Sequence, residues 1–140
     1  MASSTEFKLQ IVSADRSLVD ETVEEVEIPG AEGYFGVLAG HTPLLALLGT
    51  GELWYRQGSN LTYLHIAGGF AEVQPDRVTI LAQNAERADE IDVARAEAAK
   101  KRAEERLASA HPDMDFERAR IALLKSLIRL QVASKVRVRG

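Results

Sequence analysis

Cysteine is absent from this 140-residue chain, and so are the segments that carry a protein into a membrane. Without thiols the chain has neither disulfide bonds nor thiolate chemistry, which is compatible with a reducing compartment. Residues 1–5 lack the basic and apolar regions of a signal peptide, and residue 2 is not the glycine that myristoylation needs. The longest apolar run, residues 43–48, has the length of a strand and is far short of the ~18–20 residues of a membrane span. We therefore expect a soluble protein that associates with membranes only through other proteins.

Catalytic motifs are missing as well. No glycine loop followed by lysine and serine or threonine is present to hold phosphate, and Gly30, Gly33 and Gly36 are spaced as turn glycines. The histidines fall in three separate segments with neither metal-ligand spacing nor a glycine-flanked nucleophilic serine. These histidines are His41, His65 and His111. We predict no catalytic site and no metal site.

His41 is the histidine of most interest, because residues 39–43 read as a tight loop on a sheet scaffold, where binding residues tend to lie. A histidine that hydrogen-bonds its own loop explains the same residue without a ligand. The sequence favours this second interpretation.

Composition divides the chain near residue 88. Most glycines, prolines and aromatic residues precede this point, whereas ten alanines follow it. Residues 1–88 carry 5 basic and 12 acidic side chains and residues 89–140 carry 12 and 9, so the two parts have net charges of −7 and +3. The basic part suits an acidic protein surface, while the acidic part would repel a polyanion such as nucleic acid.

The first part reads as short strands separated by turns. Apolar residues alternate with polar ones at the period of two that a half-buried strand requires, and Gly, Pro, Asn and Asp mark the breaks, one of which is expected at Gly68-Gly69. The apolar positions are Phe7, Leu9, Ile11, Val26, Ile28, Leu53, Tyr55, Leu64, Ile66, Phe70, Val73, Val78, Ile80 and Ala82. Many short strands without interleaved helices predict a β-sandwich or barrel over residues 1–88.

The second part has helical periodicity. Asp89 is the expected N-cap of a first helix, with Asp92 three residues later, and small residues dominate one stripe of that helix. Residues 111–113 interrupt the pattern at a proline, and Asp113 or Asp115 is expected to cap a second helix over about residues 116–133. The first-helix stripe contains Val93, Ala96, Ala99, Ala103 and Leu107. We predict a two-helix antiparallel hairpin over residues 89–140, so the fold class is α+β.

The second helix carries more apolar surface than a small-residue partner can bury. Its first stripe contains Phe116, Ala119, Leu123, Leu127 and Leu130, and its second contains Ile121, Leu124, Ile128 and Val132. Together they span more than half of the circumference. We therefore expect the hairpin to be stable only when it docks on a further surface.

Arginine and lysine line the polar sides of both expected helices. The basic positions are Arg95, Arg102 and Arg106 on the first helix and Arg118, Lys125 and Arg129 on the second. Two such faces could hold a polyphosphate, because arginine binds phosphate oxygens in a fork. Ordinary solvated charge explains the pattern equally simply and is the favoured interpretation from spacing alone.

Four ordered segments make the chain resemble the epsilon subunit of bacterial and chloroplast F-type ATP synthases. They are residues 36–44 (GVLAGHTPL), 68–73 (GGFAEV), 78–82 (VTILA) and 91–96 (IDVARA). The resemblance covers about residues 7–133. It implies a non-catalytic rotor subunit at the cytoplasmic face of the bacterial plasma membrane, with a sandwich bound to the gamma subunit and to the c-subunit ring.

The resemblance also implies roles for individual residues. The hairpin of the family folds onto the sandwich or extends toward the alpha and beta subunits, where it inhibits ATP hydrolysis; the candidate contacts are Arg118, Arg120, Lys125 and Arg129. Candidate contacts with the c-ring are Glu32, Tyr34 and His41. No cofactor is required.

A regulatory ATP site is the last implication of the resemblance. Some bacterial members bind ATP through an Ile-Asp-x-x-Arg-Ala motif together with basic residues of the second helix. The matching positions are Ile91, Asp92, Arg95, Ala96, Lys125 and Arg129. Lys125 stands where arginine is usual and offers a point charge in place of a planar fork, and Ala39 stands where proline is usual.

Two other functions remain open from the residues alone. A generic adaptor would use the hairpin for oligomerisation, and a nucleic-acid binder would use the terminal cations Lys135, Arg137 and Arg139. Retention of a gamma-like partner would favour the rotor subunit over the adaptor, and salt-dependent binding to DNA or RNA would favour the third function.

Overall fold

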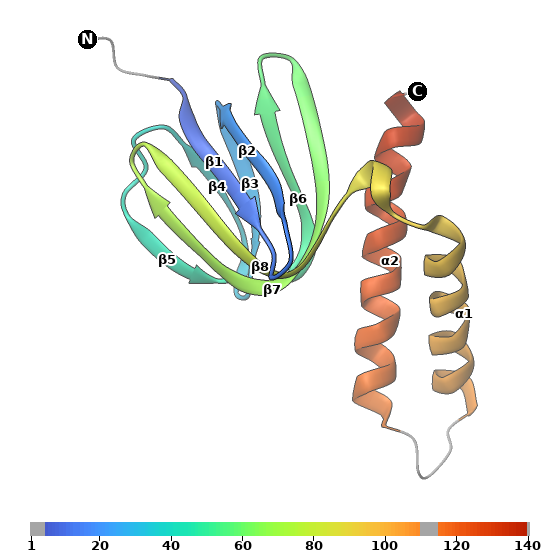
Figure 1. The fold of residues 1–140 in the computed structure, drawn as a ribbon. Coiled ribbons are helices and arrows are strands. Elements are labelled where there is room, and N and C mark those ends of the chain that lie inside the picture. Colours follow the sequence, from blue (N-terminus) through green and yellow to red (C-terminus); the bar gives the residue numbers. More distant parts are fainter. Residues whose placement is uncertain (1–4, 110–114, 140) are drawn as a thin grey trace. The chain divides into compact units, whose positions relative to one another are not determined.

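The computed structural model describes residues 5–109 and 115–139, and the backbone forms two compact units, residues 1–87 and 88–140. The first unit holds eight strands and the second holds a short 3₁₀ turn and two helices (Figure 1). The strands are β1 (Phe7–Val12), β2 (Ser17–Val23), β3 (Glu25–Gly30), β4 (Gly33–Leu38), β5 (Leu44–Leu47), β6 (Thr50–Gln57), β7 (Asn60–Gln74) and β8 (Arg77–Arg87). The turn is η1 (Ala88–Glu90), and the helices are α1 (Val93–Ser109) and α2 (Phe116–Arg139).

The eight strands form one sheet that folds over on itself into two layers. The hydrogen-bonded order is β2-β1-β8-β7-β6-β3-β4, and β5 pairs with the far half of β7. Strand β7 pairs with β6 over its first half and with β5 over its second half, so it runs through both layers (Figure 1). The predicted sandwich is confirmed, with the addition that β1 pairs with β8 in parallel.

Glycines make the bend of β7 possible. Gly68 and Gly69 both have positive φ, at 75° and 116°, and a side chain at Gly69 would collide with the backbone of Leu81 on β8. The sequence placed a strand break at this pair, whereas the structure carries one 15-residue strand through it. Strand β7 is long because it crosses from one layer to the other.

The inner faces of the two layers make a single apolar core. The alternation predicted from the sequence is confirmed at Leu9, Ile28, Leu53, Leu64 and Ile80, all of which are fully buried. Phe70 is the exception, because 49% of it is exposed on the outer surface. Its assignment to the inward pattern is wrong: the chain changes its phase of alternation at the glycine bend, so that Ala71 and Val73 point inward instead.

Edge strand β2 is tied to the strands of the opposite layer by side chains. The buried Tyr55 hydroxyl donates to Oε2 of Glu21 at 2.7 Å. Arg87 Nη1 donates to the Leu18 carbonyl at 3.1 Å. Burial raises the pKa of Tyr55, and the hydrogen bond with Glu21 raises it further. These contacts close one side of the sandwich.

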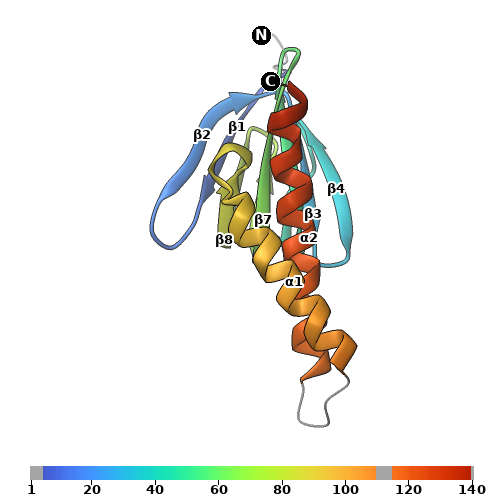
Figure 2. The same ribbon diagram turned by 90° about the vertical axis from the view of Figure 1, so that its right-hand side faces the viewer.

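In the second unit, α1 and α2 lie side by side as an antiparallel hairpin (Figure 2). Asp92 Oδ1 accepts the amide of Arg95 at 3.1 Å, and Asp115 Oδ1 accepts the amide of Arg118 at 3.0 Å. Both aspartates are therefore N-caps. Asp89 is not the N-cap that the sequence predicted, because it belongs to the 3₁₀ turn η1. The expected break at residues 111–113, with the alternative cap Asp113, lies outside the described residues.

Small residues form the seam between the two helices. Ala96 and Ala103 of α1 are buried, as are Ala119, Ser126 and Ala133 of α2. On each helix these residues repeat every seven positions, the spacing that keeps one stripe against a partner helix. The buried Ser126 hydroxyl is satisfied within its own helix by the Ala122 carbonyl at 2.9 Å. The small-residue stripe predicted for the first helix is thus confirmed at Ala96 and Ala103, whereas Ala99 is only half-buried.

Of the first apolar stripe predicted for the second helix, Ala119 is buried, Leu123 and Leu130 are half-buried, and Phe116 and Leu127 are exposed. Ser126 and Ala133 join Ala119 in the seam. Close approach of an alanine-rich helix admits only small residues from its partner. Phe116, Ile121, Leu124 and Leu127 are left exposed.

Candidate functional site

The tip between β3 and β4 presents Glu32 to the solvent. Ala31 and Glu32 form a two-residue turn between the paired Gly30 and Gly33, and both turn residues are exposed. Tyr34 follows on β4, and its ring is 55% exposed while its hydroxyl accepts the Glu52 amide at 3.0 Å. Two of the three candidate ring contacts, Glu32 and Tyr34, are therefore exposed on one β-hairpin.

His41 lies beyond the opposite end of β4. Its Nδ1 donates to the Thr42 carbonyl at 2.6 Å, and the neighbouring Gly40 amide donates to the Pro75 carbonyl at 2.8 Å. His41 thus hydrogen-bonds its own loop, as the simpler interpretation of the sequence predicted. Because β4 separates this loop from the β3–β4 tip, the structure does not bring His41 together with Glu32 and Tyr34.

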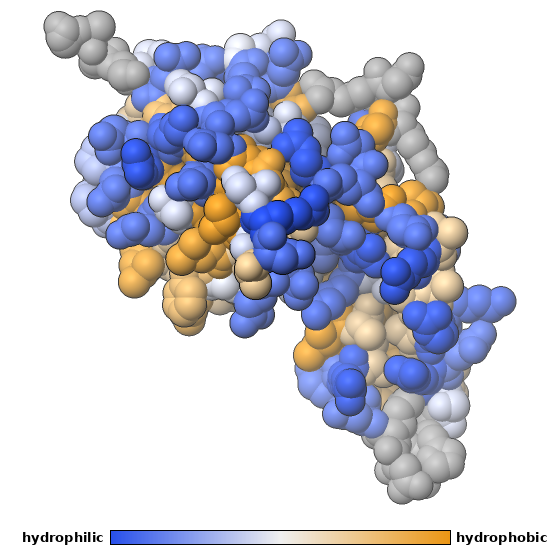
Figure 3. Space-filling view, viewed as in Figure 1, coloured by the Kyte–Doolittle hydropathy of each residue, from blue (hydrophilic) through white to orange (hydrophobic). Residues whose placement is uncertain are grey.

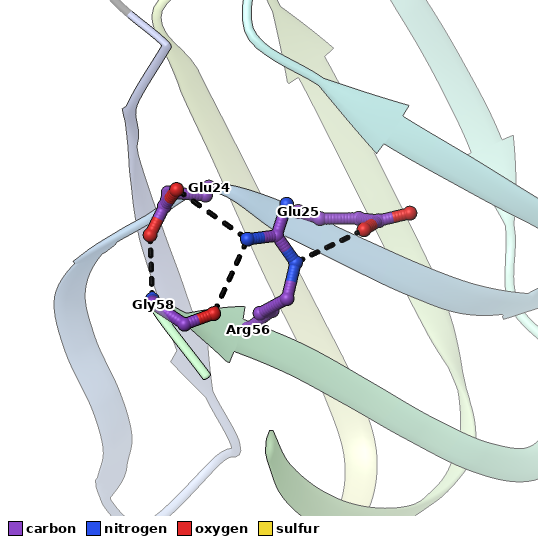
Figure 4. Close-up of polar contacts among 4 residues, drawn as sticks. All are labelled: Glu24, Glu25, Arg56 and Gly58. Atoms are coloured by element: carbon purple, nitrogen blue, oxygen red, sulfur yellow. Dashed lines mark hydrogen bonds and ion pairs between the residues drawn. The ribbon is translucent and has the colours of Figure 1, made fainter. Parts of the chain in front are cut away.

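A charged cluster lies where the start of β3 pairs with the end of β6 (Figure 4). Arg56 donates from Nε to Glu25 at 3.3 Å and from Nη1 to Glu24 at 3.4 Å and to the Gly58 carbonyl at 3.3 Å. Glu24 also accepts the Gly58 amide at 2.5 Å. A depression of about 400 Å³ adjoins the cluster and is lined by Thr5, Glu24, Leu38, Ala39 and Arg56. The cluster fixes the β6–β7 turn against the start of β3.

The outer face of one layer carries an apolar row. Leu47, Phe70 and Leu81 are direct cross-strand neighbours on β5, β7 and β8. They are 60%, 49% and 53% exposed. Val12 of β1 continues the row beside Leu81, and Leu45 lies two residues from Leu47 on the same strand. Figure 3 shows apolar side chains gathered over this part of the sandwich. We call these five residues the apolar row.

The start of α1 holds four of the six candidate ATP residues. Ile91 and Ala96 are buried, whereas Asp92 and Arg95 are exposed. One carboxylate oxygen of Asp92 is already engaged as the N-cap acceptor. The amide groups of this first helical turn, together with the Arg95 guanidinium, make a local environment that favours an anion.

The other two candidates, Lys125 and Arg129, lie on α2. Equal numbers of residues separate Ala96 from the end of α1 and Arg129 from the start of α2, so the antiparallel hairpin places them at the same height. Lys125 is exposed about one turn before Arg129. By this count Arg129 is the α2 candidate nearest to the start of α1, and Lys125 lies farther toward the loop.

A second depression, of about 270 Å³, lies on α2 itself. It is lined by Arg120, Ile121, Leu123, Leu124 and Leu127. Arg120 Nη2 pairs with Glu117 at 2.6 Å, and this hydrogen bond raises the pKa of the fully exposed Arg120. Arg118 and Lys125, the remaining candidate inhibitory residues apart from Arg129, are exposed on the same helix. The result is an apolar surface with basic residues beside it.

Side chains that could bind a metal ion do not cluster in the part of the chain that the structure describes. Within residues 5–109 and 115–139, no group of three or more His, Cys, Asp or Glu is placed to hold a metal ion. Across the same ranges, no helix is both long and apolar enough to cross a membrane.

Sequence reasoning missed the apolar row and the contact between Tyr34 and Glu52. The row joins residues of four strands, β1, β5, β7 and β8, so only the sheet register reveals it. Exposed leucines in residues 43–48, next to a proline, were the available signal. The Tyr34 contact spans 18 residues and leaves no local pattern.

Both units match family models. Residues 6–88 match the beta-sandwich domain of the ATP synthase delta/epsilon chain, and residues 89–134 match the long alpha-helix domain of the same chain. The two matches follow one another along the chain in the order of the two structural units.

Curated relatives and solved structures agree with these matches. The ATP synthase epsilon chain of Syntrophobacter fumaroxidans is 51% identical over 129 residues, which cover 92% of this chain and 96% of the relative. The epsilon chain of Herpetosiphon aurantiacus is 48% identical over 128 residues, covering 91% and 93%. A chain in the Euglena gracilis mitochondrial ATP synthase structure, which contains OSCP, F1 and the c-ring, has a TM-score of 0.70 at 26% identity, covering 99% of this chain and 84% of that one.

Proposed function

The chain belongs to the ATP synthase delta/epsilon family as an accessory, non-catalytic chain of that complex, and we propose that it turns with the central stalk of a proton-translocating F-type enzyme. In this proposal the sandwich binds the gamma subunit and the c-subunit ring, and the hairpin restrains ATP hydrolysis. The protein would sit peripherally at the cytoplasmic face of the bacterial plasma membrane. The similarity to a chain of a structure that contains F1 and the c-ring supports this assignment.

The apolar row is the observation that carries the proposal. Leu47, Phe70 and Leu81 form a flat, contiguous apolar strip, and strips of this kind on a folded protein mark interaction surfaces. Polar side chains such as Glu72 and Thr79 flank the strip on the same strands. An apolar centre with a polar rim is the common anatomy of a protein–protein interface. We assign the gamma subunit to this face because the family's sandwich is held on the stalk.

The β3–β4 tip is the proposed contact with the c-ring. Glu32 lies at the apex of a short, hydrogen-bonded hairpin, so its carboxylate is available to a basic or hydrogen-bonding group. Tyr34 lies beside it, whereas His41 belongs to a separate loop at the other end of β4. The tip and the His41 loop would therefore meet different parts of the rotor.

The hairpin is the proposed brake on hydrolysis. Ile121, Leu124 and Leu127 leave apolar surface on α2 that α1 does not cover. The basic candidates Arg118, Arg120, Lys125 and Arg129 give this helix an electrostatic preference for acidic surfaces on the alpha and beta subunits. Such a helix is suited to insertion between larger subunits.

A bound ATP would stabilise the form in which the hairpin is folded onto the sandwich. In support, Arg129 falls close to the level of Arg95 by residue count, with Lys125 about one turn farther toward the loop, a span of basic groups that suits an extended polyphosphate. A ligand that binds only one form stabilises that form by RT ln(1 + [L]/Kd), about 2.7 kcal/mol at a hundredfold excess over Kd. High ATP would then hold the hairpin away from the catalytic subunits, and low ATP would release it.

Affinity capture of the gamma subunit tests the assignment. Tagged gamma subunit is mixed with the full chain and with a chain that ends at Ala88, and the retained amounts are measured. Stoichiometric retention of both chains supports binding through the sandwich. Loss of both would contradict the rotor assignment, and oligomerisation of the chain without gamma would favour the generic adaptor.

A further inference from the structure

The β3–β4 tip is fixed to the neighbouring β5–β6 segment by backbone hydrogen bonds. The Ala31 amide donates to the Leu47 carbonyl at 2.8 Å, and the Gly49 amide donates to the Pro29 carbonyl at 2.9 Å. The two bonds hold the turn itself at Ala31 and the end of β3 at Pro29. The tip is therefore ordered by its neighbours before any partner arrives.

A side chain completes this attachment where strand pairing ends. Strand β3 pairs with β6 only from Glu25 to Glu27, and Pro29 has no amide hydrogen to extend the ladder. Beyond this ladder, the Glu52 amide of β6 donates to the Tyr34 hydroxyl at 3.0 Å. The phenol of β4 therefore links the hairpin to β6 past the end of the β3–β6 ladder.

Gly51 makes room for this contact. A Cβ atom at Gly51 would collide with the Tyr34 hydroxyl and would lie 2.7 Å from Cβ of Pro29. Any larger residue must displace either the tyrosine or the proline. The Tyr34 ring can therefore occupy its position only because residue 51 has no side chain.

We infer that Tyr34 is a positioning residue, which locks the β3–β4 tip so that Glu32 meets the c-ring without an ordering cost. This inference rests on the proposed contact between the tip and the ring. Tyr34 was a candidate contact residue in its own right, but its hydroxyl is already committed to the Glu52 amide. A pre-ordered tip binds more tightly than a mobile one with the same contacts, because less conformational entropy is lost on binding.

Substitution of Tyr34 tests the inference in the gamma-bound chain, with the detergent-solubilised c-ring as the binding partner. Tyr34→Phe removes only the hydroxyl and should weaken ring binding about threefold, and Tyr34→Ala should weaken it about tenfold, the range set by one lost hydrogen bond and added mobility. Exchange of the Glu52 amide hydrogen should become faster in both variants. Tyr63→Phe removes a phenolic hydroxyl from β7 and should leave ring affinity unchanged.

Gamma affinity and the thermal midpoint separate positioning from a general structural role. In Tyr34→Phe, gamma affinity should stay at its wild-type value, and the thermal midpoint should fall by no more than the loss of one hydrogen bond causes. Gly51→Ala should lower ring affinity by a similar factor, and the double variant should be no weaker than the weaker single variant, because both changes break one contact. Faster Glu52 exchange with unchanged ring affinity would overturn the inference, as would additive losses in the double variant.

Glu32→Gln distinguishes this inference from the function on which it rests. If Glu32→Gln weakens ring binding and Tyr34→Phe does not, the tip contacts the ring but Tyr34 does not position it. If neither substitution changes ring binding, the tip is not a ring contact, and both the inference and that part of the proposed function are wrong. Loss of ring affinity in both variants supports both.

Discussion

Phe70 on β7 and Leu81 on β8 are direct cross-strand partners on the outer face of the sandwich, and about half of each residue is exposed. Neither side chain belongs to the hydrophobic core of the sandwich. With Leu47 on the next strand, the pair forms the centre of the apolar row that we assign to the gamma subunit.

Phe70→Ser should weaken gamma binding by tenfold or more, because an aromatic residue at the centre of an interface commonly contributes about 2 kcal/mol. The thermal midpoint of the free chain should barely move, since the side chain is not part of the core. Gln74→Ser, on the same strand but outside the apolar row, is the matched control. Equal gamma affinities for the two variants, measured by titration calorimetry, would exclude this face as the docking surface.

Asp92 and Asp115 form a natural pair for testing the ATP site, since each accepts the amide three residues later as an N-cap. Asp92→Ala and Asp115→Ala should each cost about 1 kcal/mol of helix stability. Asp92→Ala should also lower the affinity for ATP, and by more than Asp115→Ala does, when both are measured by calorimetry on the isolated chain. Equal ATP affinities in the two variants would remove Asp92 from the site.

Ala103→Leu should loosen the hairpin, because the small-residue seam leaves no room for three more carbon atoms. Overpacking of this kind costs roughly 1–3 kcal/mol. Hydrogen exchange across α1 should accelerate while exchange in the sandwich stays the same. Ala98→Leu, at an exposed position of the same helix, should be neutral or slightly stabilising. Similar exchange rates in the two variants would contradict the seam described above.

Tyr55 should make the sandwich sensitive to alkaline pH. Burial and the hydrogen bond with Glu21 raise its pKa above the ordinary value of 10.0, so above that pH the unfolded chain loses the phenolic proton first. The contribution of Tyr55 to the free energy of unfolding is fully present below pH 10 and is lost as the pH rises through the raised pKa of the folded state. Tyr55→Phe should lower stability by about 0.5–1.5 kcal/mol at neutral pH and flatten the alkaline decline. Parallel alkaline limbs in denaturant titrations would show that Tyr55 is not responsible.

The sequence was sufficient to predict the two-part layout, because apolar residues alternate with a period of two in the first part and follow a helical period in the second. Alternation at Leu9, Ile28 and Leu64 reports which residues face inward within one strand. It reports nothing about what happens when a strand crosses between layers. Phe70 follows the Gly68–Gly69 bend, where the phase changes, so its exposure could not be read from the preceding residues.

The same limit applies to the candidate site residues. Periodicity identified the alanine stripe of α1, but the partner stripe on α2 depends on how closely the helices approach, which favours Ser126 over Leu127. Local signals also predicted two caps near the helix starts and chose Asp89 for the first, whereas the structure uses Asp92. The contact from Tyr34 to Glu52 required the full register of the sheet.

The most direct test of the account is ATP hydrolysis by the reconstituted catalytic complex, compared between the full chain and a chain that ends at Ala88. The central claim is that the sandwich alone attaches to the rotor and that the hairpin alone restrains hydrolysis. We predict that both chains remain bound to gamma, and that hydrolysis is faster with the shorter chain, most clearly at low ATP. Equal rates at all ATP concentrations, with both chains bound, would contradict the claim.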